Sequence, residues 1–104
     1  MKLSEMQTTQ EQKFMKLTDE QKKKYLAEIK NWQLKEKSLE KEFVFEKYAE
    51  GVIFANKVAS LADKINHHPD IFIGFKKVKI SLWTHKISDV SLNDFILAAK
   101  IDLL

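Results

Sequence analysis

The fold is decided by the central stretch of the chain, which runs from Tyr48 to Pro69 and reads YAEGVIFANKVASLADKINHHP. Its apolar residues recur at steps of three and four, the spacing that places side chains on one face of an α-helix. The pattern predicts a long amphipathic helix over residues 48–65, whose alanines allow close packing on a sheet. We expect it to end before Pro69, because proline disfavours helical backbone for the residue that precedes it.

Segments on both sides of this helix alternate apolar and polar residues, which is the spacing of β-strands. Two strands are expected before the helix and two after it, and the short link at Lys37 and Ser38 favours a hairpin for the first pair. The four expected strands cover residues 32–36, 39–46, 71–75 and 78–83.

Two capping boxes predict further helices at the two ends of the domain. Thr18 and Gln21 begin a helix over about residues 19–30, and Ser91 and Asp94 begin a last helix that runs to the C-terminus. The chain therefore predicts one α+β domain over residues 18–104, in the order α-β-β-α-β-β-α. We expect a four-stranded antiparallel sheet with three helices packed on one face. Residues 1–17 are polar and predict a frayed or partly helical extension.

Composition excludes several classes of function. The chain has no cysteine, so disulfides, thiolate nucleophiles and thiolate metal sites are absent. It has no arginine and a net charge of only +3 with scattered lysines, which predicts no nucleic-acid partner. No apolar run approaches the roughly 20 residues that span a bilayer, and no signal peptide is recognisable. A cytoplasmic protein without a membrane partner is expected.

All three histidines lie in two short segments, His67-His68-Pro69 and Thr84-His85. Histidine titrates near neutrality, so it can both give and take a proton. His85 falls near the end of the fourth strand, in phase with Trp83 and away from the main core. Asp63, four residues before His67, can orient an imidazole. This corner is therefore the candidate site for acid–base chemistry.

Simpler interpretations of the same residues stay open. His67 and His68 could form an exposed pair in a loop. Asp94 could serve only as the capping carboxylate of the last helix, and Trp83 and Phe75 could be packing residues. Three histidines could bind zinc, but the usual spacing of two ligands on one helical face is absent, so no metal is expected.

At these residues the sequence resembles the pterin-4a-carbinolamine dehydratases over about residues 18–104. The family pattern is an ordered set of acidic, histidine, proline and aromatic positions with defined gaps. Some positions depart from it: Ile71 stands where members commonly have tryptophan, Asp89-Val90 stands where Gly-Leu is usual, and Lys41 stands where the basic residue of the second strand is often arginine. The matching residues are Asp63, His67, His68, Pro69, Phe75, His85 and Asp94.

The resemblance implies a hydro-lyase, 4a-hydroxytetrahydrobiopterin dehydratase, that needs no cofactor. It would convert 4a-hydroxytetrahydropterin into quinonoid dihydropterin and water during recycling of the pterin cofactor. It also implies a homodimer or homotetramer. On this hypothesis His67 and His85 share the acid and base roles, and His68 binds and polarises the pterin. Asp63 orients a histidine, Asp94 supports His85 or the pocket wall, and Pro69, Phe75 and Trp83 support the substrate.

An alternative from a different class is a non-catalytic pterin-binding or protein-interaction module on the same scaffold. Ile71 motivates it, because this residue replaces an aromatic that the resemblance puts near the pocket. The second reason for this alternative is Asp89-Val90, the changed segment before the last helix.

Overall fold

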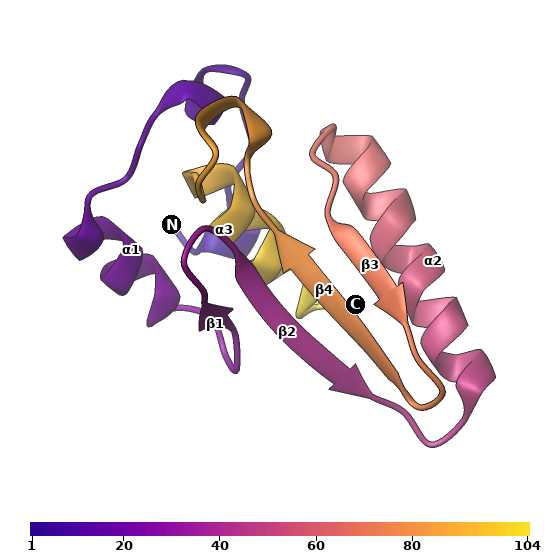
Figure 1. Cartoon of the computed structure of the whole chain (residues 1–104). Helices are drawn as coiled ribbons and strands as arrows, with labels where there is room; N and C mark the ends of the chain where they lie inside the picture. Colours follow the sequence, from indigo (N-terminus) through magenta and orange to yellow (C-terminus); the bar gives the residue numbers. More distant parts are fainter.

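The computed structural model describes every residue, 1–104. Helices and strands follow one another in the predicted order α-β-β-α-β-β-α, with additional short 3-10 helices (Figure 1). The α-helices are α1 (Asp19–Leu26), α2 (Tyr48–Ile65) and α3 (Leu92–Ile101), the strands are β1 (Gln33–Leu34), β2 (Leu39–Val44), β3 (Asp70–Ile73) and β4 (Lys77–Leu82), and the 3-10 helices are η1 (Leu3–Glu5), η2 (Glu11–Phe14) and η3 (His85–Ile87).

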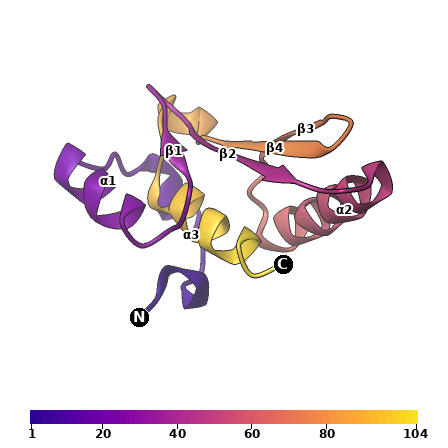
Figure 2. The same ribbon diagram turned by 90° about the horizontal axis from the view of Figure 1, so that it is seen from below.

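The strands form a single antiparallel sheet in the order β1-β2-β4-β3. β1 and β2 pair as a hairpin, as do β3 and β4, and the central contact joins β2 to β4. All three α-helices lie on the same side of this sheet, as Figure 2 shows. The predicted α+β architecture, with helices on one face of a four-stranded antiparallel sheet, is confirmed.

The core lies between the sheet and helices α2 and α3. Every second residue of β4 points toward the helices and is fully buried. α2 approaches the sheet closely at Gly51, where a β-carbon would lie 3.3 Å from a methyl group of Val78. Burying each large aliphatic side chain of this layer contributes about 1.5–3 kcal/mol. The fully buried apolar residues are Leu39, Val58, Val78, Ile80, Leu82, Val90, Phe95, Ile96, Leu97, Ala98 and Ile101.

α2 covers the predicted residues, but Asn66 rather than Pro69 ends it. Asn66 adopts the left-handed conformation with φ 54° and ψ 44°. Its N–H bonds back to Ala62 and Asp63, and the His67 N–H donates to the Ala62 carbonyl at 3.1 Å. This is a left-handed C-terminal cap. Glycine is the most common residue in such a cap, and asparagine is the next best suited. It turns the chain sharply, so His67 leaves the helix pointing back toward the protein.

All the other α-helices and strands end earlier than the sequence predicts, among them α1, β3 and β4. α1 stops at Leu26 instead of residue 30, because the following segment turns so that Ile29 and Trp32 enter the core. β3 ends at Ile73, so Phe75 lies in the β3–β4 turn. β4 ends at Leu82, so His85 lies on η3 and not on a strand.

Residues 1–17, which we call the N-terminal arm, carry the 3-10 helices η1 and η2 and lie against α3. The sequence predicted a frayed or partly helical extension here. Leu3 is buried in the core, and Lys100 Nζ donates to the Ser4 carbonyl at 2.9 Å. η1 and η2 both contact α3. None of the helices combines the length and the apolar character that crossing a membrane requires.

Candidate active site

His67 and Asp94 form a buried pair at the centre of the candidate site. The His67 side chain is 7% exposed and that of Asp94 is fully buried, and His67 Nε2 lies 2.5 Å from Asp94 Oδ1. His67 comes from the turn after α2, and Asp94 comes from the first turn of α3. A hydrogen bond to a carboxylate is strong when water is excluded, so this contact fixes the orientation of the imidazole.

The second oxygen of Asp94 binds the segment that carries His85. Oδ2 accepts hydrogen bonds from Thr84 Oγ1 at 2.7 Å and from the Ser91 N–H at 2.8 Å. Since the Thr84 hydroxyl donates its only hydrogen to Asp94, the Ser91 hydroxyl donates to Thr84 at 2.7 Å. Asp94 is therefore both the capping carboxylate of α3 and the partner of His67. The expected support of His85 is indirect, because it passes through Thr84.

The hydrogen bonds of Asp94 also indicate which nitrogen of His67 can react. An ionised carboxylate only accepts, so Nε2 carries the hydrogen that points at Oδ1. No protein group bonds Nδ1, and the chain contains no fully buried side-chain nitrogen or oxygen without a partner. Nδ1 therefore retains access to the surface. This is the atom through which His67 can exchange a proton with a bound molecule.

His85 projects from η3 and stacks on Trp83. The two ring centroids are 3.9 Å apart and the ring planes differ by 18°. The His85 side chain is exposed, whereas Trp83 is half-buried. The sequence correctly placed both rings on the same side, away from the core. The indole restricts the orientation of the His85 imidazole and leaves its edge open to solvent.

The loop that carries His85 is closed by Thr84 and Asp89. The Thr84 N–H donates to the Asp89 carbonyl at 2.9 Å, and Ser88 takes a left-handed conformation with φ 49° inside the loop. The Asp89 carboxylate accepts from Lys22 Nζ of α1 at 3.0 Å and from the Val90 N–H at 2.7 Å. α1 thus anchors the base of this loop.

This environment shifts the titration of Asp89. Partial burial alone raises the pKa of a carboxyl group, but the hydrogen bond and charge of Lys22, the Val90 N–H and the more distant Lys16 act in the opposite sense. The net result is that the pKa of Asp89 lies below its ordinary value. The loop is therefore held by an ionised carboxylate.

His68 lies at the surface beside the buried pair. Its Nε2 is 2.9 Å from Asp63 Oδ1, and both side chains are mostly exposed. Asp63 was expected to orient a histidine, and it contacts His68 and not His67. Pro69 directly precedes β3 and is half-buried. His68 is consequently held only by an exposed hydrogen bond to Asp63, which constrains the ring weakly.

Two sequence candidates lie away from these histidines. Phe75 is 74% exposed in the β3–β4 turn. β3 runs from Asp70, next to the histidines, to Ile73, so the turn is on the order of 15 Å farther along the sheet. Ile71 pairs with Ile80 and faces the helices, where it packs against the core. The Ile71 side chain, which stands where the resemblance puts an aromatic near the pocket, therefore lies on the covered face of the sheet.

The structure shows no cluster of three or more histidine, aspartate or glutamate side chains with the geometry to hold a metal ion. His67 and His68 are adjacent in the chain, but their Nε2 atoms contact different carboxylates, Asp94 and Asp63. The arrangement suits proton transfer by imidazoles that are oriented by carboxylates.

The sequence profile of the family described as Pterin 4 alpha carbinolamine dehydratase matches residues 15–104. The chain belongs to this family. A member from Sulfurisphaera tokodaii is 43% identical over 89 residues, which cover 86% of this chain and 96% of the relative. One from Methylococcus capsulatus is 42% identical over 90 residues, which cover 85% and 79%. Both relatives carry the name pterin-4-alpha-carbinolamine dehydratase provisionally.

Solved structures agree with membership of the pterin-4-alpha-carbinolamine dehydratase family. A transcriptional coactivator/pterin dehydratase from Brucella Melitensis superposes with a TM-score of 0.81 at 25% identity, covering 86% of this chain and 97% of that one. A pterin dehydratase-like protein described as a RuBisCO assembly factor in the alpha-carboxysome gives a TM-score of 0.61 at 28% identity, covering 70% and 87%.

For this member of the pterin-4-alpha-carbinolamine dehydratase family, sequence reasoning missed three polar residues around the site. Thr84 and Ser91 connect Asp94 to the His85 loop, and Asn93, next to Asp94, is fully buried. Two features of the sequence could have identified them as site residues: Thr84 is next to His85, and Ser91 and Asn93 lie in the capping box of Asp94. Short polar residues in such places usually serve the backbone, so the pattern alone did not indicate a link between histidines.

Proposed function

We propose that this protein is a hydro-lyase that dehydrates 4a-hydroxytetrahydropterin to quinonoid dihydropterin and water, in recycling of the tetrahydrobiopterin type of cofactor. The observation that carries the proposal is the buried His67–Asp94 pair, which is joined through Thr84 to the loop of His85 in a chain of the dehydratase family. Two imidazoles with access to a bound molecule are what this reaction needs.

The chemistry sets the requirements for the site. The C4a–O bond breaks with its electron pair on oxygen, and a general acid protonates the departing hydroxide so that water leaves. A general base removes a proton from a ring nitrogen of the pterin, and the new double bond forms. Each proton transfer contributes about 10²–10⁴-fold to the rate. No redox partner enters the balance.

We assign the acid and base roles jointly to His67 and His85, with His68 binding and polarising the pterin. His67 would act through Nδ1, since Asp94 holds Nε2. Asp63 would orient His68, and Trp83 would position His85 by stacking. Pro69 would support the turn between these groups. Phe75, which lies outside the histidine cluster, would only support the substrate.

We further propose that the protein acts in the cytoplasm as a homodimer or homotetramer, with the pterin as its ligand and no nucleic-acid or membrane partner. The scattered lysines support the absence of a nucleic-acid partner. Tyr48 and Ile53 remain exposed on α2 and leave apolar surface that a second copy could cover. Sedimentation equilibrium of the purified protein tests the assembly.

The decisive test is the dehydration of 4a-hydroxytetrahydropterin by the purified protein, followed by absorbance of the quinonoid product. We expect turnover well above the uncatalysed rate, and a loss of about 10²–10⁴-fold in kcat for His67→Ala. His68→Ala, whose side chain is exposed and lies outside the buried pair, is expected to raise KM more than it lowers kcat. A wild-type rate equal to the uncatalysed rate rejects the proposal.

A second candidate is a non-catalytic binding or interaction module. One observation favours it: a neighbour of 28% identity is described as a RuBisCO assembly factor. The His85 loop also departs from the family pattern, because Asp89-Val90 stands in place of the usual Gly-Leu. This candidate predicts absent turnover together with retained pterin binding, or a protein partner recovered by cross-linking. Full turnover without a partner excludes it.

A further inference from the structure

We propose that the N-terminal arm is a positioning element of the histidine site, and that Thr8, Lys13 and the Thr9–Asn93 contact hold His67 and Asp94 in register. The role in turnover rests on the proposed dehydratase function. The arm forms no hydrogen bond to the imidazoles of His67 and His68, which bond Asp94 and Asp63. It acts on the backbone directly before His67 and on the residue directly before Asp94.

The first set of contacts lies at the end of α2. Thr8 Oγ1 donates to the Ile65 carbonyl at 3.1 Å, and Lys13 Nζ donates to the Asn66 carbonyl at 3.2 Å. Carbonyls at a helix C-terminus lack partners inside the helix, so donors from elsewhere must satisfy them. Here the arm supplies those donors at the two residues that precede His67. The turn that aims His67 is therefore fixed from outside the helix.

The second set of contacts lies at the start of α3. The fully buried Asn93 side chain donates from Nδ2 to the Thr9 carbonyl at 2.9 Å, and its Oδ1 accepts from the Thr9 N–H at 3.4 Å. The Asn93 side chain thus bonds both the N–H and the carbonyl of Thr9, as a neighbouring β-strand would. Asn93 immediately precedes Asp94, so the arm and the buried His67–Asp94 pair meet at adjacent residues of one helical turn.

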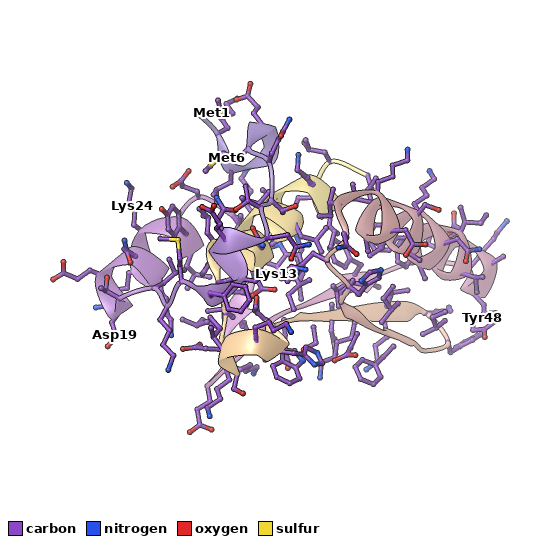
Figure 3. The ribbon with its side chains drawn as sticks, turned by 90° about the horizontal axis from the view of Figure 1, so that it is seen from above. Met1, Met6, Lys13, Asp19, Lys24 and Tyr48 are labelled. Atoms are coloured by element: carbon purple, nitrogen blue, oxygen red, sulfur yellow. The ribbon has the colours of Figure 1, made fainter.

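A third contact places the arm beside the His85 loop. η2 of the arm packs against η3, and Figure 1 shows the indigo arm next to the orange loop. Figure 3 shows Lys13 near the middle of the molecule, far from Asp19 and Lys24 at one end and Tyr48 at the other. Residues 8–14 thus contact all three segments that carry His67, His85 and Asp94.

The consequence is that the geometry of the site depends on residues outside the family pattern. The family profile begins at residue 15, after both Thr8 and Lys13. The hydrogen bond between His67 and Asp94 joins two elements that are 27 residues apart in sequence. The arm is bonded to both, at positions 65–66 and 93, and so restricts their relative movement. A reacting group misplaced by about 1 Å costs up to roughly 10²-fold in rate.

The test compares three forms of the full chain that differ only in arm contacts. The double variant Thr8→Val/Lys13→Met removes the donors to Ile65 and Asn66 with little change in volume. The conservative double variant Thr8→Ser/Lys13→Arg retains them. Lys100→Met is the matched control, because it removes an arm contact of the same kind, to the Ser4 carbonyl, away from the histidines.

The readouts are kcat and KM for dehydration, and long-range ¹H–¹⁵N spectra of the three histidine side chains. We expect Thr8→Val/Lys13→Met to lower kcat about fivefold to twentyfold with KM nearly unchanged, and to alter the His67 Nε2 signal. Thr8→Ser/Lys13→Arg is expected to keep the wild-type kcat and the wild-type His67 signal. Lys100→Met is expected to lower the midpoint of unfolding and to leave kcat and the His67 signal as in the wild type.

Each outcome decides the inference. A wild-type His67 signal and wild-type kcat in Thr8→Val/Lys13→Met overturn it, as does an equal change of both in Lys100→Met, which would make the arm merely stabilising. If the wild-type protein has no turnover, the proposed function fails, but the His67 spectra still test the arm. A signal that changes only in Thr8→Val/Lys13→Met then supports the positioning role by itself.

Discussion

The Thr84 hydroxyl donates a hydrogen bond of 2.7 Å to Asp94, the same carboxylate that holds His67 through its other oxygen. Thr84 immediately precedes His85. The buried Asp94 carboxylate therefore connects the two histidine segments. Because it also accepts from the Ser91 N–H, the same carboxylate caps α3. Changes at Thr84 are expected to affect stability and chemistry together.

Thr84→Val keeps the shape of this buried side chain and removes its hydroxyl. Ser91 Oγ then loses its acceptor, and Asp94 Oδ2 retains only the Ser91 N–H. We expect the free energy of unfolding to fall by about 1–3 kcal/mol, measured by urea denaturation, and kcat to fall with it. Thr84→Ser keeps the hydroxyl and is expected to lose less. A Thr84→Val protein as stable and active as the wild type contradicts the assigned network.

Trp83→Leu removes the aromatic ring that His85 stacks on, and Trp83→Phe keeps a smaller one. We expect kcat to fall more in Trp83→Leu than in Trp83→Phe, because the imidazole loses its orientation. The ring current of the indole, 3.9 Å away, displaces the His85 proton resonances, and this displacement should disappear in Trp83→Leu. Unchanged His85 resonances in Trp83→Leu show that the rings do not stack in solution.

Lys22→Met tests the anchor of the His85 loop through its pH dependence. The pKa of Asp89 is lowered in the folded protein, so the folded state binds fewer protons than the unfolded state in acid. The stabilisation is present above the unfolded pKa and is lost as pH falls through the lower folded pKa. Lys22→Met should therefore be less stable than the wild type at about pH 7, and the difference should shrink toward about pH 2.

Lys23→Met is the control for this prediction, because it removes the same charge from the same helix without touching Asp89. Its unfolding free energy should follow that of the wild type at both pH values. A difference between Lys22→Met and the wild type that does not change with pH assigns the effect to packing of the lysine stem.

Asn66 is the residue whose left-handed backbone aims His67. Asn66→Gly is compatible with that conformation and is expected to leave stability nearly unchanged. Asn66→Ala adds the steric cost of the left-handed region for a residue with a β-carbon, about 1–2 kcal/mol relative to glycine. Thermal unfolding measures both variants. Equal midpoints for Asn66→Gly and Asn66→Ala contradict a role of the left-handed cap in ending α2.

Much of the fold was predictable because its signals are local. The capping box at Thr18 and Gln21 is present, and the apolar period of residues 48–65 predicted α2 with its observed ends. Strand boundaries were less accurate. An alternating pattern continues through Phe75 and Trp83, but β3 ends at Ile73, where the chain turns back into β4, and β4 ends at Leu82, its last residue paired with β2.

The amino-acid sequence by itself determined the order of helices and strands and the small set of residues capable of acid–base chemistry. Only the tertiary structure decided that β4 lies beside β2, that Asp94 contacts His67, and that the N-terminal arm bonds Asn93 and the end of α2. The physical reason is that periodicity and capping depend on neighbours within a few residues. Partners across 27 or 84 residues are selected by the packing of the whole domain.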